Sequence, residues 1–89
     1  MLKISQVGPP NHTITLRLEG RLVGPWVAEA GKTFERVISE GRMLKLDLAE
    51  VEFIDTNGLA LLSSLKSRGV WLVECSLFIA EQLKTGTNG

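Results

Sequence analysis

The chain has 89 residues, which is enough for one domain and leaves no room for a second core. Hydrophobic residues make up 44% of it, a share typical of a globular fold rather than of a disordered chain. Ten basic residues balance ten acidic ones, so the chain lacks the basic field that draws proteins to nucleic acid. No apolar stretch approaches the ~20 residues of a membrane-spanning helix and no signal peptide is evident, so we expect a soluble, cytoplasmic domain without direct membrane insertion.

Two strands are predicted at the start of the chain. Residues 2–7 make a short first strand, and the turn residues "GPPN" at 8–11 end it. In "HTITLRLEG" the apolar side chains of Ile14, Leu16 and Leu18 alternate with polar ones, a period of two that is typical of a half-buried strand. We expect these two strands to pair as a hairpin.

The first helix is predicted in "LVGPWVAEAGKTFERVISEG". Pro25 suits the first helical position, and Gly41 follows the end as a cap. Apolar residues recur at helical spacing along one stripe of this segment, which indicates the face that packs against a sheet. The stripe consists of Val27, Ala30, Phe34, Val37 and Ile38.

The second half of the chain continues the alternation of strands and helices. "MLKLDL" at 43–48 is the next strand, and a helix over 57–68 ends at Gly69. "VWLVE" at 70–74 is almost wholly apolar, as are the strands inside parallel sheets. Ser76 caps a last helix that runs to about Leu83.

The predicted order is therefore ββαβαβα. Strands separated by helices need crossover connections, so part of the sheet must be parallel and the helices must pack on it. We predict a single α/β domain over residues 1–84, with a mixed β-sheet, and a flexible C-terminal tail over 85–89.

Enzymatic and metal sites lack their usual parts. The single histidine, His12, lies beside a predicted turn and is expected to face solvent, and the single cysteine, Cys75, is expected to be a buried structural residue with a raised pKa. Trp26 and Trp71 fit packing better than recognition. We expect no catalytic residue, no metal and no cofactor, and therefore a protein that is not an enzyme.

Four acidic residues leave three interpretations open. Asp47, Glu50, Glu52 and Asp55 could be a solvated rim, a docking surface for a basic partner or a cation site. Strand alternation scatters them over two faces, which favours the solvated rim.

The stretch "DTNG" at 55–58 is the strongest candidate site. It falls where a strand ends and a helix begins, so free backbone N–H groups and the positive end of the helix dipole meet there. Asp55, Thr56 and Asn57 could each be an ordinary N-cap, yet one cap suffices. A phosphate on Thr56 would be stabilised at such a helix start, which makes this hydroxyl a candidate phosphorylation site.

The chain resembles the STAS domain family, which includes sulfate-transporter C-terminal domains and bacterial anti-sigma factor antagonists. The resemblance rests on "LRLEGRLVG" at 16–24, "LKLDLAEVEFIDTNGLALL" at 44–62 and "RGVWLVECS" at 68–76. In the antagonists an Asp precedes a phosphorylatable Ser or Thr, a small residue, Gly and Leu. Here those positions are Asp55, Thr56, Asn57, Gly58 and Leu59.

Three departures accompany the resemblance. Gly24 stands where the family often has Asp, so the entry into the first helix must differ locally. The acceptor is Thr56 rather than the commoner Ser. The chain also ends sooner after Leu83 than many members do, which would leave a smaller sheet and an exposed edge for a partner or a second copy in a homodimer.

The resemblance implies a protein–protein switch. The unphosphorylated loop around Asp55–Leu59 would dock onto an anti-sigma factor serine/threonine kinase, and phosphate on Thr56 would block docking. In that role Asp55 is a cap or an orienting neighbour of the hydroxyl, Asn57 belongs to the contact surface, Gly58 allows close backbone approach, and Leu59 is an apolar contact.

An alternative reading is also a binding role. "IDTNGLALL" is similar to stand-alone STAS subunits that contact the ATPase of lipid-trafficking ABC transporters, where Thr56 would be a plain contact residue. Scaffolding and nucleotide binding, reported for some family members, are further possibilities.

Overall fold

The computed structural model describes residues 2–8 and 12–86. The elements follow the predicted order ββαβαβα: β1 Leu2–Val7, β2 Thr13–Leu22, α1 Pro25–Ser39, β3 Met43–Ile54, α2 Thr56–Ser67, β4 Trp71–Val73 and α3 Leu77–Gly86. No helix in these described ranges is both long and apolar enough to cross a bilayer. Residues 9–11 of the expected turn and 87–89 of the expected tail lie outside the described residues.

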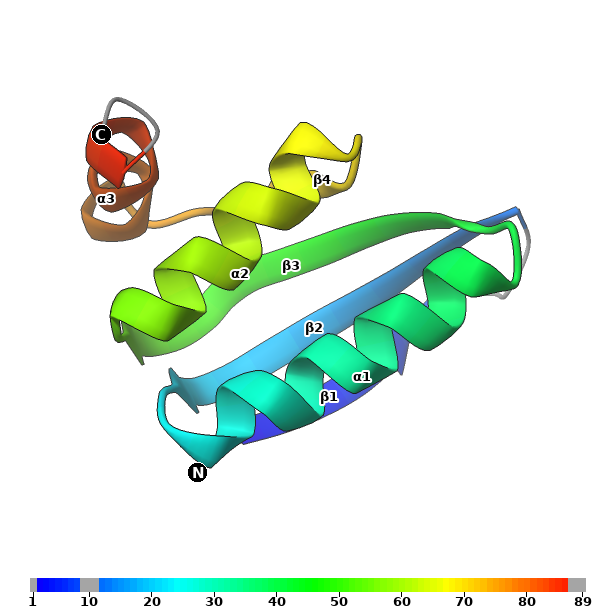
Figure 1. Ribbon diagram of the computed structural model, residues 1–89, viewed down its shortest axis with the longest axis horizontal. Coiled ribbons are helices and arrows are strands. Elements are labelled where there is room, and N and C mark those ends of the chain that lie inside the picture. The colour runs from blue at the N-terminus through cyan, green and yellow to red at the C-terminus, as the bar shows by residue number, and fades with distance from the viewer. Residues whose placement is uncertain (1, 9–11, 87–89) are drawn as a thin grey trace.

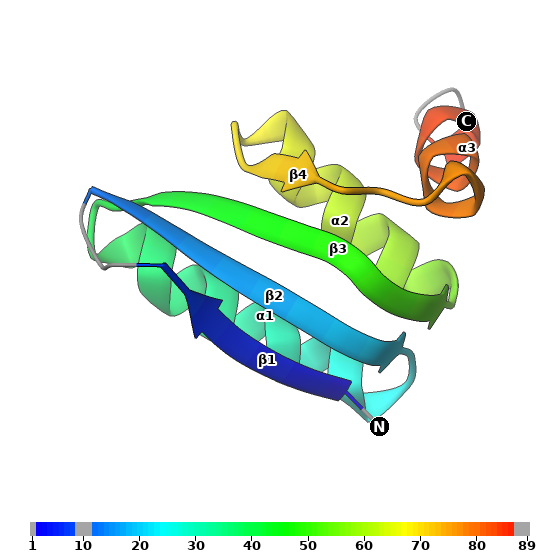
Figure 2. The same ribbon diagram turned by 180° about the vertical axis from the view of Figure 1, so that it is seen from behind.

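The four strands form one mixed sheet in the order β1-β2-β3-β4. β1 and β2 pair antiparallel, which confirms the predicted hairpin, and β2–β3 and β3–β4 pair parallel, as the intervening helices require. α1 and α2 lie side by side on one face of the sheet, and α3 lies past the carboxyl end of β4 (Figures 1 and 2). Both α1 and α2 begin at the edge where β2 and β3 end.

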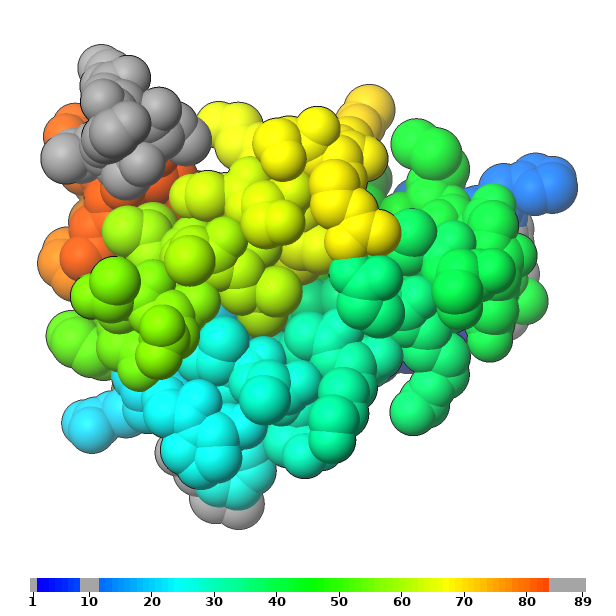
Figure 3. Space-filling view, in the orientation of Figure 1, coloured from blue at the N-terminus to red at the C-terminus, as the bar shows by residue number. Residues whose placement is uncertain are grey.

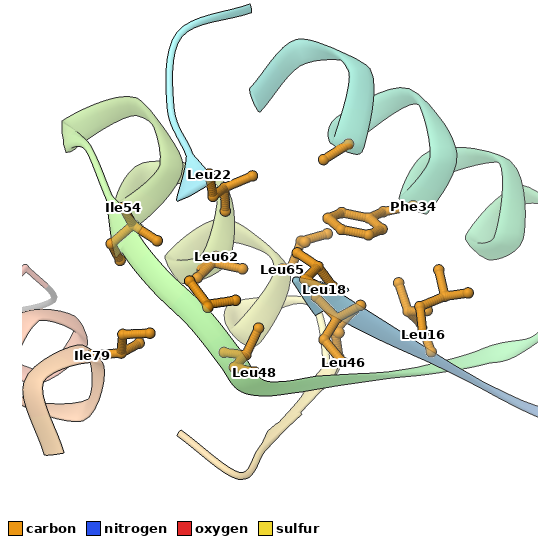
Figure 4. Close-up of a cluster of buried hydrophobic side chains, with 14 of the residues drawn as sticks. Leu16, Leu18, Leu22, Phe34, Leu46, Leu48, Ile54, Leu62, Leu65 and Ile79 are labelled. Atoms are coloured by element: carbon orange, nitrogen blue, oxygen red, sulfur yellow. The ribbon is translucent and has the colours of Figure 1, made fainter. Parts of the chain in front are cut away.

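The core fills the layer between the sheet and the helices (Figure 4). Every buried side chain in the described residues is apolar, and leucine dominates. The predicted face of β2 is confirmed, since Ile14, Leu16 and Leu18 are buried. On α1 only Ala30 and Phe34 of the predicted stripe are buried; the flanking members are half-buried.

β3 is twice as long as predicted, because it continues through residues 49–54 that the sequence suggested were a connection. The register with β2 shifts after Arg17–Asp47 and again after Gly20–Val51. Each irregularity places an extra residue in β3, so Val51 and Ile54 still face the core although the strict alternation is lost.

The end of the chain also differs from the prediction in its bounds. β4 stops at Val73, one residue early, because Glu74 has φ 57°, a left-handed conformation outside strand geometry. The predicted cap of α3 is confirmed: the N–H of Ile79 donates to Oγ of Ser76 at 3.2 Å. α3 continues to Gly86, beyond the expected end at Leu83, so residues 85 and 86 of the expected tail are helical.

Candidate functional site

The "DTNG" stretch is a helix start rather than a loop. β3 ends at Ile54 and α2 begins at Thr56, so Asp55 alone joins them. Asp55 has φ −92° and ψ −177°, the extended conformation of an N-cap, and the N–H of Gly58 donates to its Oδ1 at 2.7 Å. Of the three caps that the sequence allowed, the structure therefore uses Asp55.

The second oxygen of Asp55 reaches across to the other helix. The N–H of Gly24, the residue before α1, donates to Oδ2 of Asp55 at 2.9 Å. One carboxylate thus binds the starts of both helices, which lie side by side at the surface (Figure 3). The Gly24 N–H first, and the Gly58 N–H second, lower the pKa of Asp55, because both hydrogen bonds favour the ionised carboxylate.

The entry into α1 differs locally because of the backbone conformation of Gly24. It has φ 56° and ψ −135°, a conformation that side chains disfavour, and α1 has no side-chain cap at this position. Pro25, which has no N–H to satisfy, opens the helix instead. The start of α1 therefore depends on a carboxylate supplied from 31 residues away.

Gly58 is buried, and the close backbone approach expected of it is made to β2 of this same chain. A Cβ at this position would lie 2.5 Å from the carbonyl oxygen of Leu22, closer than real contacts allow. The same carbonyl accepts the N–H of Asp55 at 3.3 Å. Gly58 therefore lets α2 begin directly against the end of β2.

The remaining candidate residues divide into exposed and internal ones. Thr56 and Asn57, at the first two positions of α2, are exposed. Leu59 is half-buried and packs against the core, so only part of its side chain is exposed. Thr56 and Asn57 therefore lie on the surface, whereas Asp55 and Gly58 make the internal contacts that fix the start of α2.

The acidic residues do not converge. Within residues 2–8 and 12–86, no group of three His, Cys, Asp or Glu side chains is close enough to hold a metal ion. Asp47 pairs with Arg17 at 3.4 Å, and its Oδ1 accepts the N–H of Ala49 at 3.0 Å. Asp55 is committed to the two helix starts.

Four other residues were also singled out by the sequence. His12 is exposed, as predicted. Cys75 is half-buried rather than buried, and burial raises the pKa of its thiol, with a smaller opposing effect of Lys66. Trp26 and Trp71 were expected to be packing residues, but they are 37% and 60% exposed, so neither is buried in the core.

Comparison with solved structures finds proteins of similar fold. The anti-sigma factor antagonist SpoIIAA, in its unphosphorylated form, matches with a TM-score of 0.58 at 14% identity, over 98% of this chain and 99% of that one. The chain has the STAS fold. A structure described as Mglu also matches, with a TM-score of 0.58 at 20% identity, over 79% of this chain but 18% of that one. No family model and no curated protein matches the sequence.

The SpoIIAA match bears on the expected architecture. It confirms the STAS-like architecture, a mixed four-stranded sheet with the order ββαβαβα.

Sequence reasoning missed the part of the site contributed by β2 and its following loop. Leu22 supplies the carbonyl against which Gly58 packs, and Gly24 supplies the N–H that Asp55 binds. The signal was the pair Gly24–Pro25, a glycine free to adopt positive φ directly before a helix-starting proline.

Proposed function

We propose that this chain is a non-enzymatic binding switch, similar in role to an anti-sigma factor antagonist, whose surface around Thr56 and Asn57 docks onto a serine/threonine kinase. Phosphorylation of Thr56 by that kinase ends the docking. The observation that carries the proposal is the exposed position of Thr56 as the first residue of α2, the helix whose start is capped by the carboxylate of Asp55.

The geometry suits a phosphoryl acceptor. An exposed hydroxyl at a helix start is reachable by a kinase, and the helix dipole stabilises the negative charge placed there. Because the pKa of Asp55 is lowered, its carboxylate is ionised at neutral pH and is already engaged by two N–H groups. The phosphate would therefore add charge to the surface without displacing the cap.

The electrostatics are sufficient for a switch. A phosphate adds about −1.5 to −2 charges, and burying an unpaired charge in an interface costs ~2–5 kcal/mol. At about 1.4 kcal/mol per factor of ten, docking would weaken roughly 30-fold to several-thousand-fold.

The test is a pull-down with matched charge variants. Wild-type protein, Thr56→Asp and Ser64→Asp serve as baits; Ser64 is exposed on the same helix and controls for added charge. We expect a small kinase to bind the wild type and Ser64→Asp but not Thr56→Asp. Equal kinase binding by all three baits would refute a switch at Thr56.

A second assay addresses the chemistry. The captured kinase is incubated with ATP and with wild-type protein or Thr56→Val, which keeps the side-chain shape but lacks the hydroxyl. We expect mass spectrometry to find phosphate on Thr56 of the wild type and none on the variant. Capture of an ABC transporter ATPase in place of a kinase, with Thr56 unmodified, would support the transporter role instead.

A further inference from the structure

The two edges of the sheet differ in their protection against association. β1, at one edge, carries Lys3, which pairs with Glu19 at 3.9 Å. β4, at the other edge, consists of Trp71, Leu72 and Val73 and pairs only with β3 among the described strands. Natural edge strands are protected by shortness, charge, proline or a bulge; β4 is short, but its three residues include no charge and no proline that would oppose pairing with another strand.

The surroundings of β4 are also apolar and exposed. Met43 and Trp71 are 53% and 60% exposed, and they line a hollow of about 220 Å³ beside the amino end of the strand. Past the carboxyl end, at the start of α3, Leu77 and Phe78 are 87% and 51% exposed. Exposed apolar residues therefore flank both ends of one short edge strand.

We propose that this edge binds a second copy of the chain, with the two β4 strands antiparallel about a two-fold axis at Leu72. Such an axis brings the amino end of each β4 to the carboxyl end of the other. Met43 and Trp71 of one copy then lie near the carboxyl end of β4 in the other copy. Leu77 and Phe78 of that other copy are exposed just past this end. The four-stranded sheets join into one of eight strands, with the same patch used on both copies.

Charge favours this antiparallel arrangement over a parallel one. Trp71 is paired in register with Lys45, whose ammonium lies 5.7 Å from the centre of the indole ring, and Val73 is paired with Asp47. With Leu72 opposite Leu72, Trp71 lies opposite Val73 of the other copy. Paired residues then run across the two β4 strands and the two β3 strands beside them, with Lys45 of one copy at one end and Asp47 of the other copy at the other end. A parallel register would instead place like charges at the two ends.

The site for the second copy is separate from the proposed switch. Thr56 lies at the start of α2, at the end of that helix far from β4 (Figure 1). Pairing through β4 therefore leaves Thr56 exposed, and the dimer does not depend on the proposed function. Because β4 has three residues, the shared surface is small and the dimer is expected to be weak and dependent on concentration.

The first test is sedimentation velocity over a series of protein concentrations. The wild type is compared with Trp71→Glu, which places a carboxylate beside Lys45 at an exposed position, and with Phe53→Glu, an exposed aromatic on β3 outside the edge. We expect Trp71→Glu to raise the dimer dissociation constant roughly tenfold or more, as loss of a central aromatic contact does, and Phe53→Glu to leave it unchanged. A wild type that stays monomeric at every concentration would overturn the proposal. The remaining occupant of the β4 edge would then be an extended segment of another protein.

The second test locates the contact without a substitution. Amide NMR spectra of the wild type are recorded at low and high concentration. We expect concentration-dependent shifts and slower hydrogen exchange at Trp71–Val73, because edge amides become hydrogen-bonded in the dimer. Shifts confined to β1 or to the first turn of α2 would place the interface elsewhere and refute the role of β4.

Discussion

The N–H of Gly24 lies 2.9 Å from Oδ2 of Asp55, although 31 residues separate them in the chain. The other oxygen of the same carboxylate takes the N–H of Gly58 at 2.7 Å. Asp55 therefore serves the packing of the domain as well as the candidate site, because it fixes where both helices begin relative to β2 and β3. A change in this carboxylate should be felt in stability and in the surface formed by Thr56 and Asn57.

The first prediction concerns pH. Hydrogen bonds from Gly24 and then Gly58 lower the native pKa of Asp55 below its unfolded value of about 3.9. The stabilisation is therefore complete above the unfolded pKa and is lost as pH falls through the native pKa. We expect the urea midpoint of the wild type to fall in that acidic window, and Asp55→Asn to have a lower midpoint at neutral pH with a shallower acidic decline.

Glu50→Gln is the control for that series. Glu50 is exposed on β3 and takes no part in either helix start. The acidic decline due to Asp55 should remain in this variant. If Asp55→Asn declined as steeply as the wild type, the carboxylate would not be the group responsible.

The second prediction concerns the coupling between Gly24 and Asp55. Gly24→Ala adds a Cβ that meets nothing within 4 Å, so its cost of about 1–3 kcal/mol arises from the positive φ alone. Relief of that strain would turn the N–H away from Asp55. We therefore expect the free energies of unfolding of Gly24→Ala, Asp55→Asn and the double variant to be non-additive in a double-mutant cycle.

Gly41→Ala provides the matched comparison. Gly41 also has a positive φ and open space around it, but it lies at the far end of α1. Its cost should resemble that of Gly24→Ala, while its effect should add to that of Asp55→Asn. Equal coupling in both cycles would mean that strain, and not the hydrogen bond, produces the signal.

The element order could be predicted from the sequence because hydrophobic period decides it. The alternation in β2 and the stripe of α1 reflect which residues face the core, and that pattern is local. The end of β3 could not be predicted in the same way. Its irregular register spaces the core residues Leu48, Val51 and Ile54 by three, which resembles neither a strand nor a connection.

The sequence correctly located the junction between β3 and α2 at which the candidate site lies, but the internal organisation of that junction was not foreseen. A polar stretch between a strand and a helix marks the site in the sequence, whereas the partner of Asp55 is set by how β2 and β3 lie together. The exposure of Trp71 has a similar origin. An aromatic residue in an apolar strand suggests packing, and only the sheet order places β4 at an edge.

The third prediction concerns Gly58. A methyl group there would meet the Leu22 carbonyl oxygen at 2.5 Å and Cγ of Leu22 at 3.2 Å, so the start of α2 must move. We expect Gly58→Ala to destabilise the domain by about 1–3 kcal/mol, the usual range for overpacking, as measured by urea denaturation.

Gly31→Ala is the opposite case on α1. Its Cβ would meet only Cδ1 of Leu61, at an ordinary 3.7 Å, in the interior of a helix. Alanine should stabilise this position by up to about 1 kcal/mol, because it restricts the unfolded chain more than glycine does. A stabilising Gly58→Ala would contradict the close approach between α2 and β2.

The fourth prediction concerns the reactivity of Cys75. Burial raises the pKa of its thiol, and Lys66 opposes this with a smaller effect, so the native protein holds less thiolate near neutral pH than an unfolded chain does. We expect iodoacetamide to alkylate native Cys75 more slowly than the urea-unfolded protein at the same pH. Lys66→Gln should slow the native reaction further, because it removes the cation that favours the thiolate, and should leave the unfolded rate nearly unchanged. A native thiol that reacts faster than the unfolded one would contradict this assignment and mark Cys75 as an activated group.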